Sequence, residues 1–198
     1  MSRTNSHLGL VLASTSRYRK ELLTRLHLRF RTHDPDVEEF VLPNESPTET
    51  ASRLAIAKAK AVSDLYPDSL IIGSDQVAIC DQKLLPKPLT HERAVHQLRH
   101  ASGRVVSFLT AVTLLNMTTG TAQTNVVKTE VRFRKLTNEE IDRYLQVEPA
   151  YDCAGSAKAE GLGISLMENI SSEDPTALIG LPLIALSGML RNEGILIP

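Results

Sequence analysis

The sequence predicts a mixed α/β fold, a twisted sheet with both parallel and antiparallel strands and flanking helices. Three observations predict it. Short apolar runs typical of buried strands alternate along the chain with stretches of helical periodicity. Residues 121–136 alternate apolar with charged side chains, which indicates a strand with one packed and one solvated face. Residues 117–120 read as a turn that joins this strand to residues 104–116 as an antiparallel hairpin.

Helix-starting signals mark the second and fourth expected helices. Ser46 is followed by Pro47 at the first helical position and by Glu49, which completes a capping box. Thr137 and Glu140 form the same box further along the chain. Apolar periodicity gives the remaining boundaries. The expected strands cover 8–13, 30–40, 69–80, 104–116 and 121–136, and the expected helices cover 16–28, 46–65, 90–101, 137–145 and 182–193.

Two features suggest how these elements are organised. A polar break at 73–76 interrupts the strand over 69–80, and the hairpin over 104–136 is long. Both suggest an elongated, two-lobed molecule with a central cleft. Because no repeat or linker divides the chain, we expect a single domain over 1–198, in which 1–7 form a short flexible tail.

Charge and metal-binding residue types exclude several classes of protein. The chain holds 22 Lys and Arg against 23 Asp and Glu, so nothing favours a nucleic acid or a membrane as a partner. It has neither an apolar run that spans a bilayer nor a signal peptide, so we expect a cytoplasmic protein. Cys80 and Cys153 lie far apart, which fits a reducing compartment and does not indicate a zinc site. His96 and His100 form no HExxH motif and are interpreted as surface residues.

Polar and basic residues crowd the junction between the first strand and the first helix. A helix N-terminus favours an anion, Ser14 and Ser16 add hydroxyl donors, and Arg19 adds a planar fork that suits phosphate oxygens. The alternative is a serine cap with a basic, solvent-exposed helix face, and this stretch taken alone favours that alternative. Tyr18 is either a core residue or a stacking face.

A second group of charged residues follows. Asp75 interrupts an apolar run, where it is either a turn residue or a general base or metal ligand at the end of a strand. Lys58 and Lys60 lie on opposite sides of a helix, so one of them can face a cleft. Lys87 lies between two prolines, and Glu39 belongs to an acidic run that either holds a hard cation or forms a solvated turn. Together these residues suggest metal-assisted hydrolysis of a phosphate-bearing ligand.

Seven segments between residues 9 and 192 carry a resemblance to a known family. In order they are LASTSRYRKELL, PDVEE, LAIAKAKA, IIGSDQVAI, KPLTHERAVHQLRHASG, CAGSAKAEGLGISL and GLPLIALSGML. Together and in this order they resemble the Maf family of nucleoside triphosphate pyrophosphatases. Within the family, SDQVA, AGSAKAEGLGI and GLPLIAL are similar to the branch that hydrolyses N7-methyl-GTP. The branch that acts on dTTP and UTP has threonine where this chain has Gln76.

The resemblance implies a fold related to that of inosine triphosphate pyrophosphatases and cleavage between the α- and β-phosphates, which releases pyrophosphate. It implies that Asp75 is the catalytic proton acceptor and that Glu39 and Asp75 hold a divalent cation, Mg, Mn or Co. The implied phosphate-binding residues are Ser14, Ser16, Arg19, Lys58 and Lys87. The implied base-specificity residues are Tyr18, Gln76 and Glu160.

The expected function is hydrolysis of N7-methyl-GTP in nucleotide house-cleaning. N7-methylguanine is cationic, so Tyr18 can attract it by a cation–π contact worth about 0.5–2 kcal/mol, and Glu160 can accept from its N–H edge. One alternative is a dTTP or UTP pyrophosphatase of the same family. The other is a nucleotide-binding regulator of septum formation and cell division, which would keep the phosphate-binding residues and lack catalysis. The expected partner is a small-molecule nucleoside triphosphate, and a homodimer is a family expectation.

Overall fold

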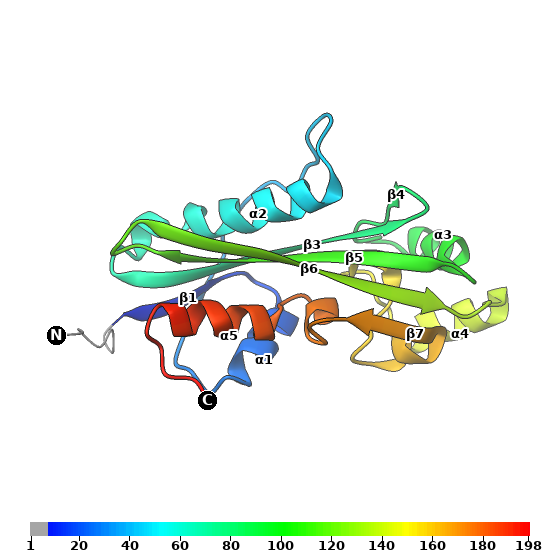
Figure 1. Ribbon diagram of the computed structural model, residues 1–198. Helices are drawn as coiled ribbons and strands as arrows, with labels where there is room; N and C mark the ends of the chain where they lie inside the picture. The colour runs from blue at the N-terminus through cyan, green and yellow to red at the C-terminus, as the bar shows by residue number, and fades with distance from the viewer. Residues whose placement is uncertain (1–7) are drawn as a thin grey trace. The chain divides into compact units, whose positions relative to one another are not determined.

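The computed structural model describes residues 8–198 and confirms the mixed α/β fold (Figure 1). The tail expected over 1–7 lies outside the described residues. Within them, the strands are β1 (Gly9–Ala13), β2 (Arg31–His33), β3 (Ser69–Cys80), β4 (Lys83–Leu84), β5 (Val105–Asn116), β6 (Thr121–Phe133) and β7 (Met167–Ser172). They form one sheet in the order β2-β1-β3-β5-β6-β7, with β4 paired to β3. β1 pairs in parallel with β2 and β3, whereas the β3–β4 and β6–β7 pairs are antiparallel.

The described part of the chain also forms five α-helices, α1 (Arg17–Thr24), α2 (Pro47–Ala61), α3 (His91–Ala101), α4 (Asn138–Val147) and α5 (Leu183–Asn192). Four of them begin with a side chain that accepts a hydrogen bond from the backbone N–H three residues on, which stabilises a helix by about 1 kcal/mol relative to alanine. These capping residues are Ser16, Ser46, Thr90 and Thr137. Both predicted capping boxes are confirmed. No helix within residues 8–198 is long and apolar enough to cross a membrane.

The chain forms two compact units and passes from one to the other within β3, β5 and β6 and again just after β7. The first unit comprises the chain up to Asp75, Thr110–Val127 and Asp174–Pro198. The second unit comprises Gln76–Leu109 and Lys128–Glu173. The cleft expected between two lobes stays a prediction, as does the assignment of a single domain.

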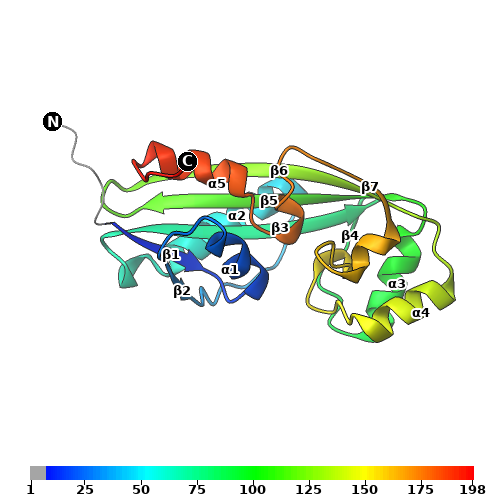
Figure 2. The same ribbon diagram turned by 90° about the horizontal axis from the view of Figure 1, so that it is seen from below.

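In the first unit, helices cover both faces of the parallel strands, with α2 on one face and α1 and α5 on the other (Figure 1; Figure 2). Leu12 of β1 packs in a cluster with Leu22 of α1 and Leu186 of α5. The next residue along the strand, Ala13, packs with Ala59 of α2. Successive strand residues point to opposite faces, and both faces are buried here. This explains why β1 and the start of β3 read as continuous apolar runs.

In the second unit, α3 packs against α4 and against the turn Ala154–Ser156 (Figure 2). Ser156 Oγ donates to Gln97 Oε1 of α3 at 2.7 Å, and both residues are buried. Gly155 has a φ of +72°, and a Cβ at this position would lie 3.1 Å from Phe108 Cζ. The backbone angle favours glycine, and a Cβ would in addition make a tight contact with the Phe108 ring.

The strand predicted over 69–80 is confirmed with the same bounds. Its polar residues at 73–76 do not interrupt it, and Ser74 and Asp75 are buried. Other strands differ from the expectation. Of the extended segment expected over 30–40, only Arg31–His33 forms a strand. β4 and β7 were not predicted. Both are largely solvent-exposed and therefore lack the apolar alternation that marks a half-buried strand.

Candidate active site

Three charged side chains of the first unit meet in a largely buried cluster. Lys58 and Asp75 are 4% and 5% exposed, and Lys58 Nζ donates to Asp75 Oδ1 at 2.7 Å. Lys58 also donates to Glu39 Oε1. The Glu39 side chain is 42% exposed, so the cluster reaches solvent on that side. Of the two lysines expected on opposite sides of the helix, Lys58 is therefore the one that faces inward, and Lys60 is exposed.

A close approach of α2 to β3 brings Lys58 to Asp75. A Cβ built on Gly73 would lie 2.1 Å from Ala55 O and 2.8 Å from Ala59 N. No side chain fits in that space, so the missing Cβ of glycine permits the contact between helix and strand. Lys58 lies one turn after Ala55 and therefore projects from the same side of α2. The small residues that precede and follow Lys58 thus determine how near it lies to Asp75.

The environment of Asp75 makes it more basic than an ordinary aspartate. Burial raises its pKa, and the positive charges of Lys58 and Arg19 oppose this rise. The negative charge of Glu39 adds to the rise. The net effect is a pKa above the usual 3.8, on a carboxylate that is held by a lysine.

Arg19 extends from α1 into the electrostatic field of the same cluster. Burial lowers the pKa of Arg19, and the charges of Asp75 and Glu39 oppose this effect. Arg19 Nε donates to Gly180 O at 2.8 Å, and Ser74 Oγ donates to the same carbonyl at 2.9 Å. Gly180 has a φ of +119°, a conformation that favours glycine. The carbonyl of this turn therefore fixes Arg19 relative to the part of β3 that carries Asp75.

Ser14, Ser16 and Tyr18 surround the first turn of α1. Ser16 Oγ accepts from Arg19 N at 3.4 Å, and Ser14 Oγ accepts from Ser16 N at 3.1 Å. The serine cap of the plainer explanation is thus confirmed for Ser16, but Arg19 does not lie on a solvent-exposed helix face. Each serine hydroxyl keeps its own proton as a donor. Tyr18 is half-buried; its hydroxyl accepts from Arg17 Nη2 at 2.7 Å. The Arg17 guanidinium lies 4.7 Å from the centroid of the Tyr18 ring.

Gln76 and Lys87 belong to the second unit. Gln76 follows Asp75 directly in β3, so the two side chains point to opposite faces of the strand. Lys87 is exposed in the loop that leads from β4 to α3. Gln97 Nε2 donates to Pro86 O at 2.8 Å and so holds the residue that precedes Lys87.

Glu160 also belongs to the second unit, where it lies in a turn that Glu148 supports. Glu148 Oε2 accepts from Gly163 N at 3.2 Å. Partial burial of its carboxyl group raises the pKa of Glu160, and the charge of Glu148 acts in the same direction. The first unit thus brings together part of the predicted site, namely Ser14, Ser16, Arg19, Glu39, Lys58 and Asp75, and the second unit carries Gln76, Lys87 and Glu160.

Arg53 of α2 fastens the segment that follows Glu39. Arg53 Nη2 donates to Phe40 O at 2.8 Å, and Arg53 Nε donates to Glu45 Oε1 at 2.6 Å. Glu45 Oε2 accepts from Leu42 N at 3.1 Å. The hydrogen bonds from Arg53 lower the pKa of Glu45 to about 2. Nothing in the sequence alone singled out Arg53, because its partners belong to an irregular loop.

Glu45→Gln is expected to destabilise the protein in a pH-dependent way. Because the folded pKa of about 2 lies below the ordinary value of 4.5, the ion pair contributes stability that is fully present above pH 4.5. This stability is lost as the pH falls through about 2. In urea unfolding, the difference in midpoint between wild type and variant should shrink below pH 4.5. Glu38→Gln, at an exposed neighbouring position, is the control, and a pH-independent difference for Glu45→Gln would contradict the expectation.

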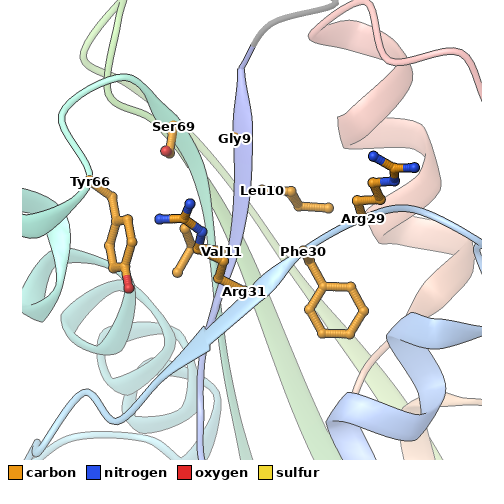
Figure 3. Close-up of a pocket in the computed structure, with 8 residues that line it drawn as sticks. All are labelled: Gly9, Leu10, Val11, Arg29, Phe30, Arg31, Tyr66 and Ser69. Atoms are coloured by element: carbon orange, nitrogen blue, oxygen red, sulfur yellow. The ribbon is translucent and has the colours of Figure 1, made fainter.

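A pocket of about 450 Å³ in the first unit is separate from the charged cluster (Figure 3). Arg31, Tyr66 and Ser69 line this pocket, and Figure 3 shows the three side chains on the same side of β1. The pocket lies where β1 and β3 begin, at Gly9 and Ser69. Sites in α/β proteins usually lie at the opposite, carboxyl ends of parallel strands. None of the predicted site residues lines this pocket, so the cluster around Asp75 is the better candidate.

The mixed α/β fold and the cluster of Lys58, Asp75 and Glu39 agree with the family implied by the sequence motifs. The chain belongs to the family described as Maf-like protein, whose model matches residues 9–193. Its relatives are more specific. A 7-methyl-GTP pyrophosphatase of Aromatoleum aromaticum is 54% identical over 96% of this chain and 97% of the relative. A protein of the same name from Thiobacillus denitrificans is 54% identical over 98% of this chain and 96% of the relative. Another, from Xanthomonas axonopodis, is 55% identical over 96% of this chain and 98% of the relative. The resemblance based on seven motifs is thereby confirmed.

Proposed function

We propose that this protein hydrolyses N7-methyl-GTP to N7-methyl-GMP and pyrophosphate and so removes a modified nucleotide. The observation that carries the proposal is the shared name of relatives that are 51–55% identical over nearly the whole chain. The ion pair between Lys58 and Asp75, with the charge of Arg19 nearby, supports it, because hydrolysis of a triphosphate needs both a base and positive charge.

Asp75 is the general base of the proposed reaction. Its raised pKa suits it to take a proton from an attacking water. The water oxygen forms a bond to the α-phosphorus while the bond from that phosphorus to the bridging oxygen breaks. The electron pair of that bond leaves with pyrophosphate, and the proton of the water passes to Asp75. Lys58, which donates to Asp75 Oδ1, holds the carboxylate in one orientation.

Positive charge and hydroxyl donors bind the triphosphate in this proposal. Arg19, Lys58 and Lys87 offset the negative charge that accumulates on the leaving pyrophosphate. Ser14 and Ser16 lie at the start of α1, where free backbone N–H groups and the helix dipole favour an anion. The serine hydroxyls accept backbone bonds and keep their protons to donate to phosphate oxygens.

The donor set at Glu39 and Asp75 fits a divalent cation such as Mg, Mn or Co. Both carboxylates accept from the same atom, Lys58 Nζ, so their oxygens already gather around one positive charge. Carboxylate oxygens are the ligands that hard cations prefer. When bound, such a cation would supply charge neutralisation at the phosphate oxygens.

Tyr18, Gln76 and Glu160 select the base. The Tyr18 ring already attracts one cation, the Arg17 guanidinium at 4.7 Å, which supports a cation–π contact with the positively charged N7-methylguanine. Glu160 carries a carboxylate that can accept from the N–H edge of the base and offset its charge. Gln76 offers an amide with both donor and acceptor groups.

The proposal also covers the domain organisation, location, oligomeric state and partner of the protein. We propose one functional domain over 1–198 that acts in the cytoplasm as a homodimer. Its partner is a small-molecule nucleotide rather than a nucleic acid or a membrane. The family match over residues 9–193 supports a single functional domain, and sedimentation of the purified chain would test the dimer.

A substrate panel is the experiment that tests the activity. We expect pyrophosphate release from N7-methyl-GTP with a kcat/KM well above that for GTP, dTTP or UTP. Glu160→Gln should lower the preference for N7-methyl-GTP over GTP by about 10-fold, because glutamine keeps an acceptor oxygen but lacks the negative charge that offsets the cationic base. Glu168→Gln, at an exposed position on β7, is the matched control and should leave the preference unchanged.

The same panel separates the alternatives. Faster turnover of dTTP and UTP would move the protein to the other branch of the family. Nucleotide binding by calorimetry without any pyrophosphate release would favour a regulator of cell division. Turnover of none of these nucleotides, with no binding, would remove the proposal altogether.

A further inference from the structure

Three side chains with different ligand chemistry converge in the second unit. They are Cys80 at the end of β3, Asp81 in the turn that follows it, and His100 in the last turn of α3. The thiol sulfur, a carboxylate oxygen and a ring nitrogen all lie within 4.8 Å of one another. Cys80 is buried, His100 is half-buried and Asp81 is exposed, so the group is anchored inside and opens to solvent. None of these residues takes part in the proposed hydrolysis.

The backbone around these side chains is held in place from both elements. His100 Nε2 lies 3.3 Å from Cys80 O, and Cys80 Sγ lies 4.0 Å from His100 O. Asp81 has a φ of +47°, so the chain turns sharply where the carboxylate begins. The C-terminal end of a helix carries partial negative charge, which favours a cation beside His100. The end of β3, the turn after it and the end of α3 therefore bring a sulfur, an oxygen and a nitrogen ligand close together.

The positively charged side chain of Arg104 already contacts Asp81 and His100. Arg104 Nε lies 3.0 Å from Asp81 Oδ2, and Arg104 Nη1 donates to His100 O. The two side chains of this ion pair are 45% and 61% exposed, and ion pairs so exposed are weak. The guanidinium shows that the group attracts positive charge, and a stronger ligand-binding cation can displace it.

We propose that Cys80, Asp81 and His100 bind a zinc ion, separate from the oxygen-only cation site at Glu39 and Asp75. Sulfur, imidazole nitrogen and carboxylate oxygen form the mixed donor set that Zn²⁺ prefers, and a water completes a tetrahedron. Ligand atoms of tetrahedral zinc lie roughly 3.3–3.8 Å apart, so atoms that lie within 4.8 Å of one another need to close by about 1.5 Å at most. The exposed Asp81 side chain can supply this movement. On binding, the thiol proton passes to solvent and Arg104 moves away from Asp81.

The test uses the full chain with Zn²⁺ or Co²⁺ as the probe. Wild type should bind a Zn²⁺ equivalent that Cys80→Ser and His100→Gln lose, with affinity lowered by at least about 10-fold. Bound Co²⁺ should give the sulfur-to-cobalt charge-transfer absorption of a thiolate ligand, and this band should vanish in Cys80→Ser. Cys153→Ser, the matched cysteine control, and Asp75→Asn, which alters the oxygen-only site, should both keep the band.

Arg104→Gln provides an independent arm. Without the competing guanidinium, zinc affinity should rise by up to about 5-fold, the range expected for an exposed ion pair. His100 is half-buried whereas Cys80 is buried, so His100→Gln disturbs the core less and serves as the deciding variant should Cys80→Ser fail to fold. Zinc affinity unchanged in His100→Gln, or a cobalt spectrum of wild type without a thiolate band, would overturn the proposal.

Discussion

Replacing Asp75 with asparagine is expected to lower kcat for pyrophosphate release by about 10²- to 10⁴-fold, the usual contribution of a general base. Asparagine has nearly the same size and keeps an oxygen that can accept from Lys58, so the packing around β3 survives. What is lost is the proton acceptor. Pyrophosphate release with saturating N7-methyl-GTP gives kcat, and calorimetry on the same preparations gives nucleotide affinity.

Two controls make the result for Asp75→Asn specific. Asp68→Asn changes an exposed aspartate just before β3 and should leave kcat unchanged. Nucleotide binding by Asp75→Asn should persist, because the phosphate-binding cations remain. A variant whose kcat stays within 10-fold of wild type would show that Asp75 is not the base.

Lys58→Met is expected to destabilise the folded protein by about 3–5 kcal/mol, the usual cost of leaving one partner of a buried ion pair alone. Asp75 then lies 5% exposed without its nearest positive charge. Methionine fills a similar volume, so the loss reflects charge rather than a cavity. Chemical denaturation at neutral pH measures the free energy of unfolding. Activity should fall together with stability, because Lys58 is also a proposed phosphate ligand.

The double variant separates the two effects of Lys58→Met. Combining it with Asp75→Asn removes both charges, so most of the lost stability should return while activity stays absent. Lys60→Met, on the exposed side of α2, should change stability by no more than about 0.5 kcal/mol. A double variant that is no more stable than Lys58→Met would contradict the assignment of the loss to an unpaired buried carboxylate.

Local signals in the sequence predicted most of the fold. The capping boxes at Ser46 and Thr137 depend on residues three apart, and both are present in the structure. The buried β1 is visible because each of its faces meets a layer of apolar side chains. β4 and β7 escaped prediction for the opposite reason. Their exposed residues pair through backbone hydrogen bonds, which leave no pattern in the side chains.

The candidate site was less accessible from the residues alone. The residues alone left Asp75 as either a turn residue or a general base or metal ligand, and the family resemblance then implied its role and that of Lys58. Their contact depends on the lack of a Cβ at Gly73, which no spacing rule reveals. The polar residues at the centre of β3 were interpreted as a break because partners such as Gly180 lie far away in the sequence. Cys80 at the end of β3 likewise lies close to His100 at the end of α3, and the sequence alone does not show that these two ends are adjacent.

The adjacency of Asp75 and Gln76 in β3 has a consequence for how such enzymes diverge. In the proposed reaction one residue performs the chemistry and the next one helps choose the substrate. Since they are consecutive in a strand, a one-residue insertion or deletion nearby would exchange the faces to which they point. New specificity in this lineage is therefore expected to arise by substitution at Gln76, Tyr18 or Glu160, whereas length changes within β3 would be eliminated by selection.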